Sequence, residues 1–295
     1  MMKDGVGVRI EPMTRLIVNA DDFGQTPGIN RAVLELHQAG LLTSATLMAR
    51  AAATDQAIEF ARTLPSLSIG CHIVLTDGEP VLPAAQIPSL LDPSTSLFFA
   101  SLNAFLGRLF TGRIRADEIE AETIAQIKSL QSRGIRVTHI DSHKHTHMFP
   151  RILRPILRGA RACGIHSVRN PFEPTWAIRA TANCNFVRAA QVSVLRGLQT
   201  RWRRILAEEG FSTTGGTLGV SCTGALSKVT LHRLLDRVRT GTWELVTHPG
   251  YYDADLARVQ TTLRASRDVE REALPVLHEF PALHLISWSQ LNPQQ

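Results

Sequence analysis

Residues 16–24 read Leu-Ile-Val-Asn-Ala-Asp-Asp-Phe-Gly, and this stretch decides how the rest of the chain is interpreted. Its apolar start favours a buried β-strand, and Thr26 and Pro27 just after it predict the start of a helix. Chemistry in parallel α/β folds gathers at strand ends, because the loops converge there above a rigid sheet. Asp21 and Asp22 would point in different directions on an extended chain, so one can hold a metal while the other handles a proton. Capping of the next helix is the competing interpretation.

Strand and helix patterns alternate along the rest of the chain, which is typical of a parallel sheet. After the first strand, helices are predicted over 26–40 and 51–64, and strands over 42–49 and 67–75. Further strands are predicted over 135–141, 165–169, 217–221, 242–246 and 284–288, and further helices over 97–111, 117–133, 150–163, 227–239 and 266–280. Without an internal repeat or a linker, these roughly seven or eight strand-helix units predict a single domain over 1–295.

Three segments do not fit this alternation. Residues 1–13 form a short polar extension, and the proline-rich segment 76–96 and the segment 172–214 are interpreted as insertions or substrate loops. Part of the last segment has the spacing of one apolar helical face, formed by Val187, Val194, Leu198, Trp202 and Ile205. We expect a packed helix with a solvated basic side; a lid over an anionic or lipid-linked substrate is the alternative.

The composition excludes several classes of protein. With 44% hydrophobic and 20% charged residues, the chain can bury a sizeable core and is not disordered. The net charge of +6 comes mostly from scattered arginines without a nucleic-acid-binding motif, so no nucleic-acid partner is expected. We find no signal peptide and no transmembrane run, and we expect a cytoplasmic protein. A homodimer is the default expectation. Free thiols in a reducing compartment suit the four cysteines, Cys71, Cys163, Cys184 and Cys222.

Potential metal ligands follow several of the predicted strands. Asp21 and Asp22 end the first strand, His143 and His248 follow two others, and His72 lies in or at the end of a fourth. In a closed parallel barrel these strand ends would meet on one face. One Asp and two His form a facial set for a divalent ion, with positions left open for water and substrate. The ion would lower the pKa of its bound water towards about 7, and a spare carboxylate would take the proton.

Three histidines at 143, 145 and 147 alternate by two, so on an extended chain they would share one face. At least one of them is expected to be a ligand. The others, His145 and His147 in particular, are candidates for hydrogen bonds to a ligand or to the substrate. Asp141 could orient a ligating histidine in the same way.

Four segments together resemble the YdjC/ChbG family of carbohydrate deacetylases, to which the hopanoid-associated HpnK proteins also belong. The resemblance runs from about Arg15 to Trp288, and the segments are Ile-Val-Asn-Ala-Asp-Asp-Phe-Gly at 17–24, Gly-Cys-His-Ile-Val-Leu at 70–75, Thr-His-Ile-Asp-Ser-His-Lys-His-Thr-His-Met-Phe-Pro at 138–150 and Thr-His-Pro-Gly at 247–250. It implies an α/β fold, a distorted (β/α) barrel of about seven strands related to polysaccharide deacetylases. It also implies hydrolysis of the N-acetyl group of an acetamido sugar.

Roles for individual residues follow from this resemblance. Asp22, His72 and His143 would hold one divalent metal ion, and a water bound to the ion would be the nucleophile. Asp21 would be the general base, and His248 the acid or the stabiliser of the tetrahedral intermediate. Magnesium is the usual metal of the family, whereas imidazole ligands favour zinc or another transition metal. The expected partner is a small N-acetylated sugar, either an oligosaccharide or a glycolipid.

Two other functions are compatible with clustered His and Asp on a barrel. A metal-dependent phosphoesterase, or another amidohydrolase-type enzyme, would usually hold two metals and need more ligands, often with a bridging carboxylate. A non-catalytic sugar-binding homologue would keep the barrel without the chemistry. The spare Asp21 and His248 argue against the second alternative, because binding alone needs no base.

Overall fold

A seven-stranded parallel sheet forms the centre of the protein, whose computed structural model describes residues 14–181 and 186–291. The expected extension at 1–13 and Cys184 lie outside the described residues. The strands are β1 Thr14–Phe23, β2 Ser44–Leu47, β3 Ser68–Ile73, β4 Val137–Ser142, β5 Thr217–Leu218, β6 Gly241–Thr247 and β7 His284–Leu285. Their order is β4-β3-β2-β1-β6-β5, and β7 pairs with the start of β1. All these pairings are parallel, which confirms the predicted α/β class.

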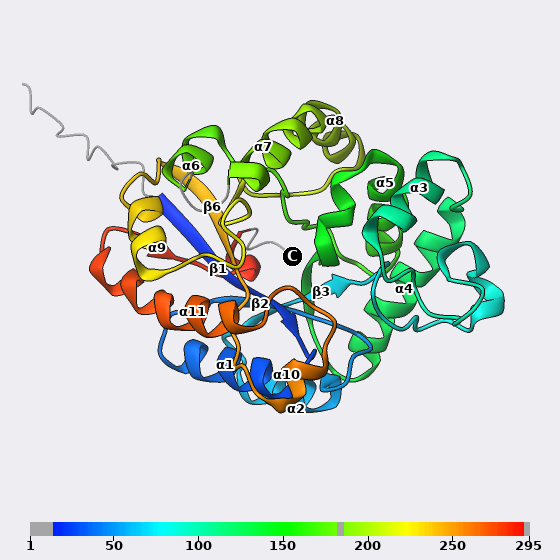
Figure 1. Ribbon diagram of the computed structural model, residues 1–295, viewed down its shortest axis with the longest axis horizontal. Coiled ribbons are helices and arrows are strands. Elements are labelled where there is room, and N and C mark those ends of the chain that lie inside the picture. The colour runs from blue at the N-terminus through cyan, green and yellow to red at the C-terminus, as the bar shows by residue number, and fades with distance from the viewer. Residues whose placement is uncertain (1–13, 182–185, 292–295) are drawn as a thin grey trace, which may run out of the picture.

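The sheet curls into a half-barrel (Figure 1). Its open side lies between the two edge strands, β4 and β5. The segment 167–172 lies along this opening. Arg169 N donates to Ile140 O on β4 at 3.0 Å, and Thr217 N on β5 donates to Phe172 O at 3.2 Å. The strand predicted over 165–169 forms only isolated bridges, because Ser167 and Val168 pair with different neighbours and Pro171 has no N–H to donate.

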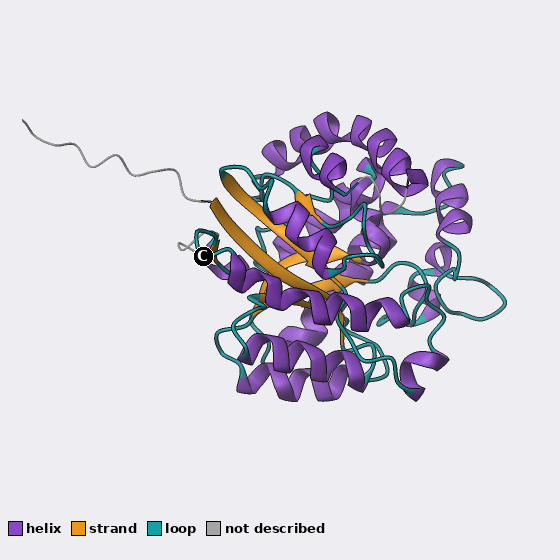
Figure 2. Ribbon diagram, turned by 60° about the vertical axis from the view of Figure 1, so that its left-hand side comes forward, coloured by secondary structure: helices purple, strands orange, loops and turns teal. Residues whose placement is uncertain are grey.

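Helices cover the outer face of the strands (Figures 1 and 2). They are α1 Pro27–Gln38, α2 Thr54–Thr63, α3 Leu102–Phe110, α4 Ala116–Ser132, α5 Pro150–Ala162, α6 Thr175–Ala180, α7 Phe186–Leu195, α8 Gln199–Glu209, α9 Lys228–Leu235, α10 Ala254–Arg258 and α11 Ala265–Ala273. The predicted cap of α1 is confirmed, since Thr26 Oγ1 accepts from Ile29 N at 3.3 Å and Pro27 opens the helix. Within the described part of the chain, none of the helices combines the length and apolarity needed to cross a membrane.

The two faces of β1 have different surroundings. Leu16, Val18 and Ala20 pack in the main apolar core, whereas Ile17 packs with Trp288 in a small separate cluster. Alternation therefore turns the polar side chain of Asn19 to the same side as Ile17, into the interior of the half-barrel. The polar residues that carry the chemistry are thus held on the inner face of the sheet, while the apolar residues beneath the helices stabilise it.

The segment 172–214 differs from the prediction of one packed helical face. It forms α6, α7 and α8, and the short 3-10 helix Arg196–Leu198 separates the last two. Trp202 on α8 is buried and donates from Nε1 to His147 O at 3.1 Å, whereas Val187 and Val194 on α7 are 65% and 78% exposed. The predicted single face is therefore wrong, because its residues lie on two helices separated by a 3-10 turn, and only the part on α8 is buried.

Candidate active site

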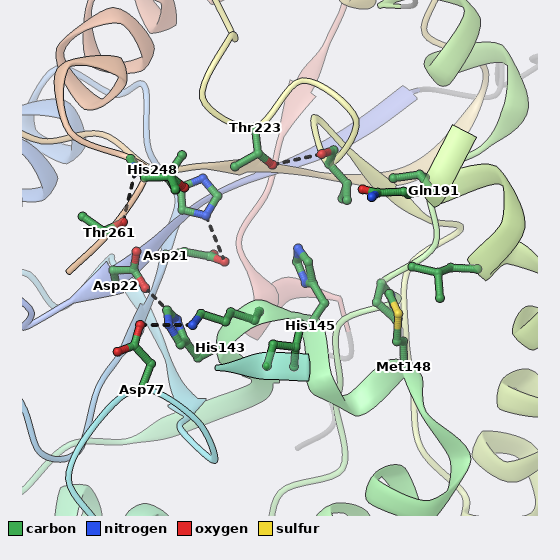
Figure 3. A pocket seen from close by; sticks show the side chains of 18 of the residues that line it. Asp21, Asp22, Asp77, His143, His145, Met148, Gln191, Thr223, His248 and Thr261 are labelled. Carbon is green, nitrogen blue, oxygen red and sulfur yellow. Dashed lines mark hydrogen bonds and ion pairs between the residues drawn. The ribbon is translucent and has the colours of Figure 1, made fainter. Parts of the chain in front are cut away.

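The three residues expected to hold a metal converge at the carboxyl end of the sheet, and Figure 3 shows two of them, Asp22 and His143, side by side. Asp22 lies at the end of β1, His72 lies on β3, and His143 directly follows β4. Asp22 Oδ1 is 3.4 Å from His72 Nε2 and 3.3 Å from His143 Nδ1. One carboxylate oxygen therefore faces two imidazole nitrogens, although the residues are far apart in the sequence.

This donor set fits a divalent ion. Ligands about 2.0–2.2 Å from one ion at tetrahedral angles would lie roughly 3.4 Å apart, close to the separations found here. His72 Nδ1 is 2.8 Å from Asp141 Oδ1, a contact that leaves Nε2 directed at Asp22. Although burial alone would lower the pKa of His72, Asp141 and Asp22 raise it to about 10, which shows how strongly this position favours positive charge.

Both aspartates of the pair line the same cavity, contrary to the expectation that they point in different directions. The pairing of β1 with β2 shifts register between Ala20 and Phe23, and Asp22 has a φ of 62°. This bulge with a left-handed residue breaks the alternation of an extended strand, so both carboxylates reach the cavity. Left-handed residues recur at Lys144 and His145, with φ values of 55° and 52°, in the turn that follows β4.

Asp21 is buried and held by an arginine. Arg169 Nη1 donates to Asp21 Oδ2 and Arg169 Nη2 to Asp21 Oδ1, both at 2.7 Å. Asn19 Nδ2 also donates to Asp21 Oδ1 at 2.9 Å. Burial raises the pKa of Asp21, but the charge of Arg169 outweighs it and the pKa lies below its ordinary value. The site therefore contains an ionised, fixed carboxylate beside the group formed by Asp22, His72 and His143.

His248 lies in the loop after β6, on the side of Asp21 that faces away from His143 (Figure 3). His248 Nε2 is 3.9 Å from Asp21 Oδ2, and His248 Nδ1 is 3.6 Å from Glu270 Oε2. Glu270 also accepts a hydrogen bond from the backbone N of His248 at 2.6 Å. Glu270 thus fixes the backbone of the loop and lies beside the ring, which faces the cavity.

Asp141 lies deeper than the ligands. It accepts from Thr46 Oγ1 at 3.1 Å, contacts His72 through the other oxygen and forms an ion pair with Arg169. The predicted contact of Asp141 with a candidate ligand is therefore present in the geometry.

His145 and His147 have different surroundings. His145 lines the cavity, and among the described residues its buried Nδ1 has no hydrogen-bond partner. In Figure 3 its ring points into the cavity. His147 Nδ1 is 2.6 Å from Ser142 Oγ, and His147 Nε2 is 3.1 Å from Arg169 O. Burial lowers the pKa of His147 to about 4, so this ring is a neutral link between two loops.

Four charged residues that the sequence analysis did not single out complete the site: Arg169, Arg267, Glu244 and Glu270. Arg267 on α11 donates from Nη2 to Asp22 Oδ2 at 2.5 Å, and with the two histidines it holds the pKa of Asp22 well below the ordinary value despite burial. A basic residue at a predicted strand end was a usable signal for Arg169. Arg267 gave none, because it lies in an ordinary charged helical pattern.

A cavity of about 1330 Å³ opens over these residues. Its floor carries the aspartates and histidines, and its far wall is formed by α3, α7, the residues just before α5 and the loops around 171, 220 and 260. Most of that wall is apolar, and its apolar residues include Ala100, Leu102, Leu106, Met148, Phe149, Phe172, Val187, Ala190, Val192, Val194, Leu195, Val220 and Leu263. Polar residues also line it, namely Asn103, Gln191, Thr223, Gln260, Thr261, Thr262 and Arg264.

Comparison with known proteins matches residues 15–280 to the family model described as YdjC-like protein. The chain belongs to the YdjC-like family. This confirms the family predicted from the four sequence segments. This chain is 33% identical over 242 residues to a carbohydrate deacetylase of Geobacillus stearothermophilus. The matched residues cover 82% of this chain and 81% of the relative.

Two further similarities extend the comparison. A carbohydrate deacetylase of Brevibacillus brevis is 40% identical over 149 residues, which is 49% of the YdjC-like chain and 54% of that relative. A crystal structure from Enterococcus faecalis V583, of a protein described as a cellobiose-phosphate cleavage protein, has a TM-score of 0.75 at 27% identity. It covers 95% of this chain and 99% of that one. The barrel architecture is therefore shared over nearly the full length of both chains.

Proposed function

We propose that this protein is a carbohydrate N-deacetylase that hydrolyses the N-acetyl group of an acetamido sugar to acetate and a free amine. The names of its relatives support the enzyme class. The observation that carries the proposal is the placement of Asp21 and His248, which are 3.9 Å apart, beside the Asp22, His72 and His143 group. Hydrolysis of an amide needs a proton acceptor, a proton donor and an electrophile at one carbonyl, and this arrangement offers a place for each.

One divalent ion would be held by Asp22, His72 and His143, with Asp141 orienting the imidazole of His72. When bound, the ion would supply Lewis-acid chemistry, since it lowers the pKa of a water towards about 7 and polarises the acetamide oxygen. The family resemblance favours magnesium, and the two imidazole nitrogens favour zinc or another transition metal.

The protein's own residues would then move the protons. Asp21, fixed by Arg169, accepts a proton from the water while the oxygen of that water attacks the acetamide carbon. The bond between carbon and nitrogen then breaks, and His248 donates a proton to the departing sugar nitrogen. Glu270 holds the backbone of the loop that carries His248. The ring of His145 points into the cavity, where it would contact the substrate.

The geometry favours one ion over the pair used by phosphoesterases. A second carboxylate and histidine group exists, formed by Asp21, His72 and Asp141, but it shares His72 with the first. Arg169 also contacts both of its carboxylates, so a second cation would have to displace a buried guanidinium. A protein that only bound sugar would gain nothing from burying Asp21 next to His248, because an ionisable group is costly to bury.

The apolar wall of the cavity favours a lipid-linked acetamido sugar over a longer oligosaccharide. Sugar hydroxyls placed against the buried side chains of Met148 or Phe172 would lose hydrogen bonds to water without replacement. The volume of about 1330 Å³ exceeds the roughly 300–1,000 Å³ of typical small-molecule sites, so there is room for an apolar group beyond the sugar.

Acetate release tests this function directly. The enzyme would be incubated with N-acetylated chito-oligosaccharides and with an N-acetylglucosamine that carries an alkyl chain, before and after chelation and after return of Mg²⁺ or Zn²⁺. We expect release that chelation abolishes and metal restores, with a higher kcat/KM for the alkyl substrate. Hydrolysis of a phosphate ester without acetate release would instead support a phosphoesterase, and sugar binding without any turnover would support the non-catalytic alternative.

A further inference from the structure

We infer that Glu244 is a positioning residue for the proposed general base, because it fixes the guanidinium that orients Asp21. The inference rests on the proposed function, since it concerns the residue to which the reaction assigns the proton. Glu244 lies on β6, is fully buried and is not among the described residues that line the cavity. Its hydrogen bonds toward the site run through Arg169.

The contacts of Arg169 show how the two carboxylates are linked. Glu244 Oε1 accepts from Arg169 Nε at 3.0 Å and from Nη2 at 2.8 Å. The other edge of the guanidinium, formed by Nη1 and Nη2, donates to both oxygens of Asp21 at 2.7 Å. Nη1 also pairs with Asp141. A guanidinium has five N–H groups in a rigid plane, and these five contacts engage both of its edges.

This arrangement makes the orientation of Asp21 depend on Glu244. Because the guanidinium is planar, holding the Nε edge against Glu244 fixes the plane in which the second edge meets Asp21. Without that anchor, the guanidinium can turn about the bond between Cδ and Nε, and the carboxylate of Asp21 turns with it. A displacement of about 1 Å at a reacting group can lower a rate roughly a hundredfold.

Burial of the acid at this position carries a cost of its own. Burial raises the pKa of Glu244 to about 7 although Arg169 opposes the shift, which means that the ionised form is costly here. Glu244 Oε2 is buried and has no hydrogen-bond partner among the described residues. Replacing the acid alone would not remove this cost, because buried Arg169 Nε would lose its acceptor, and removing one partner of a buried ion pair is destabilising. The acid at this position therefore serves the guanidinium of Arg169.

The test compares Glu244→Leu and Glu244→Gln with a control at Trp288. Trp288 Nε1 donates to the same Glu244 oxygen at 3.3 Å, so Trp288→Phe removes a neighbour of the acid without touching Arg169. We expect kcat for acetate release to fall about 10–100-fold in Glu244→Leu and less in Glu244→Gln, which keeps a neutral acceptor for Arg169. KM and bound metal should stay at wild-type values, because Asp22, His72 and His143 are unchanged. Trp288→Phe should keep kcat.

The outcomes separate this inference from the proposed function. A wild-type enzyme that releases no acetate from any acetylated amino sugar overturns the proposed function itself. With an active wild type, Glu244→Leu and Glu244→Gln within about threefold of the wild-type kcat would overturn the role of Glu244. Loss of metal, or a rise in KM that matches the loss of kcat, would also overturn it. Should Glu244→Leu not fold, the isosteric Glu244→Gln decides, with folding checked by its unfolding temperature.

Discussion

Replacing Asp21 by Asn removes the proposed proton acceptor while leaving the side chains of Asp22, His72 and His143 unchanged. General base catalysis typically contributes 10²–10⁴-fold, which corresponds to about 3–5 kcal/mol of the barrier. We therefore expect kcat for acetate release to fall by that factor. Bound metal should stay at the wild-type level, since Asp21 is not part of the group formed by Asp22, His72 and His143.

The same change has a structural cost that can be estimated from the contacts of Arg169. Both oxygens of Asp21 accept from this guanidinium at 2.7 Å, whereas Asn offers one oxygen and places an NH₂ group against a second donor. Breaking a buried ion pair costs about 3–5 kcal/mol, and the remaining hydrogen bond returns roughly 1 kcal/mol of it. The unfolding temperature should therefore drop, so activity has to be expressed per folded, metal-loaded protein.

Asp77→Asn is the matched control for this experiment. Asp77 lines the same cavity and pairs with Lys144 at 3.0 Å, but it has no contact with Arg169 in the structure. Its isosteric replacement should leave kcat within a fewfold of the wild type. Acetate would be measured by a coupled assay and metal by elemental analysis of the same samples. Wild-type turnover by metal-loaded Asp21→Asn, or an equal loss in Asp77→Asn, would refute the assignment of Asp21 as the base.

Three further changes test other parts of the structure. Asp141→Asn removes the negative acceptor 2.8 Å from His72 Nδ1, so metal affinity, measured by titration, should fall about 10–100-fold, and unchanged affinity would contradict the orienting role. In Gly70→Ala the new Cβ would lie 2.5 Å from the buried imidazole of His139, so the free energy of unfolding, measured in urea titrations, should fall by about 1–3 kcal/mol. The control Gly107→Ala has open space around its new Cβ and should raise the free energy of unfolding by less than about 1 kcal/mol. The pKa of His147 is about 4 in the folded protein and near 6.5 in the unfolded chain, so the unfolded state binds the proton first as the pH falls. The contribution of His147 to the free energy of unfolding should therefore drop by about 2 kcal/mol between pH 7 and pH 5. A His147→Asn variant whose stability has the same pH dependence as the wild type would disprove this.

Elements with a strong local signal could be predicted from the sequence. The helix at 26–40 has a Thr cap, a proline in its first turn and apolar residues at helical spacing, and the structure has α1 there. The helix expected from 97 begins later, at Leu102. Phe98 pairs instead with Leu91, and Ser101 caps the helix, with Ala104 N donating to its side chain at 3.4 Å. A local cap and the short-range pairing of Phe98 with Leu91 outweighed the apolar pattern.

The candidate site could be predicted where its residues stand at strand ends. Asp22, His72 and His143 follow from the position of strands in a parallel sheet, because such strands share one carboxyl edge. The partners of these residues could not be predicted in the same way. Glu244 lies in the middle of β6, where an acid in a single sequence looks like an exposed strand residue. Glu244 is buried beneath Arg169, which comes from the segment that lies along the opening of the half-barrel. This contact forms only in the folded protein, so it leaves no local pattern in the sequence.

The two arginines provide a physical reason for the different roles proposed for two adjacent aspartates. Alternation along β1 cannot separate the pair, because both side chains reach one cavity. Arg169 lies 148 positions from Asp21 and occupies both of its oxygens, whereas Arg267 lies 245 positions from Asp22 and contacts one oxygen only. Asp22 Oδ1 is thus left facing the histidines, where a cation is favoured, and Asp21 stays ionised without joining that group. The proposed division between ligand and base therefore depends on distant cations, since the strand presents the two carboxylates as near equals.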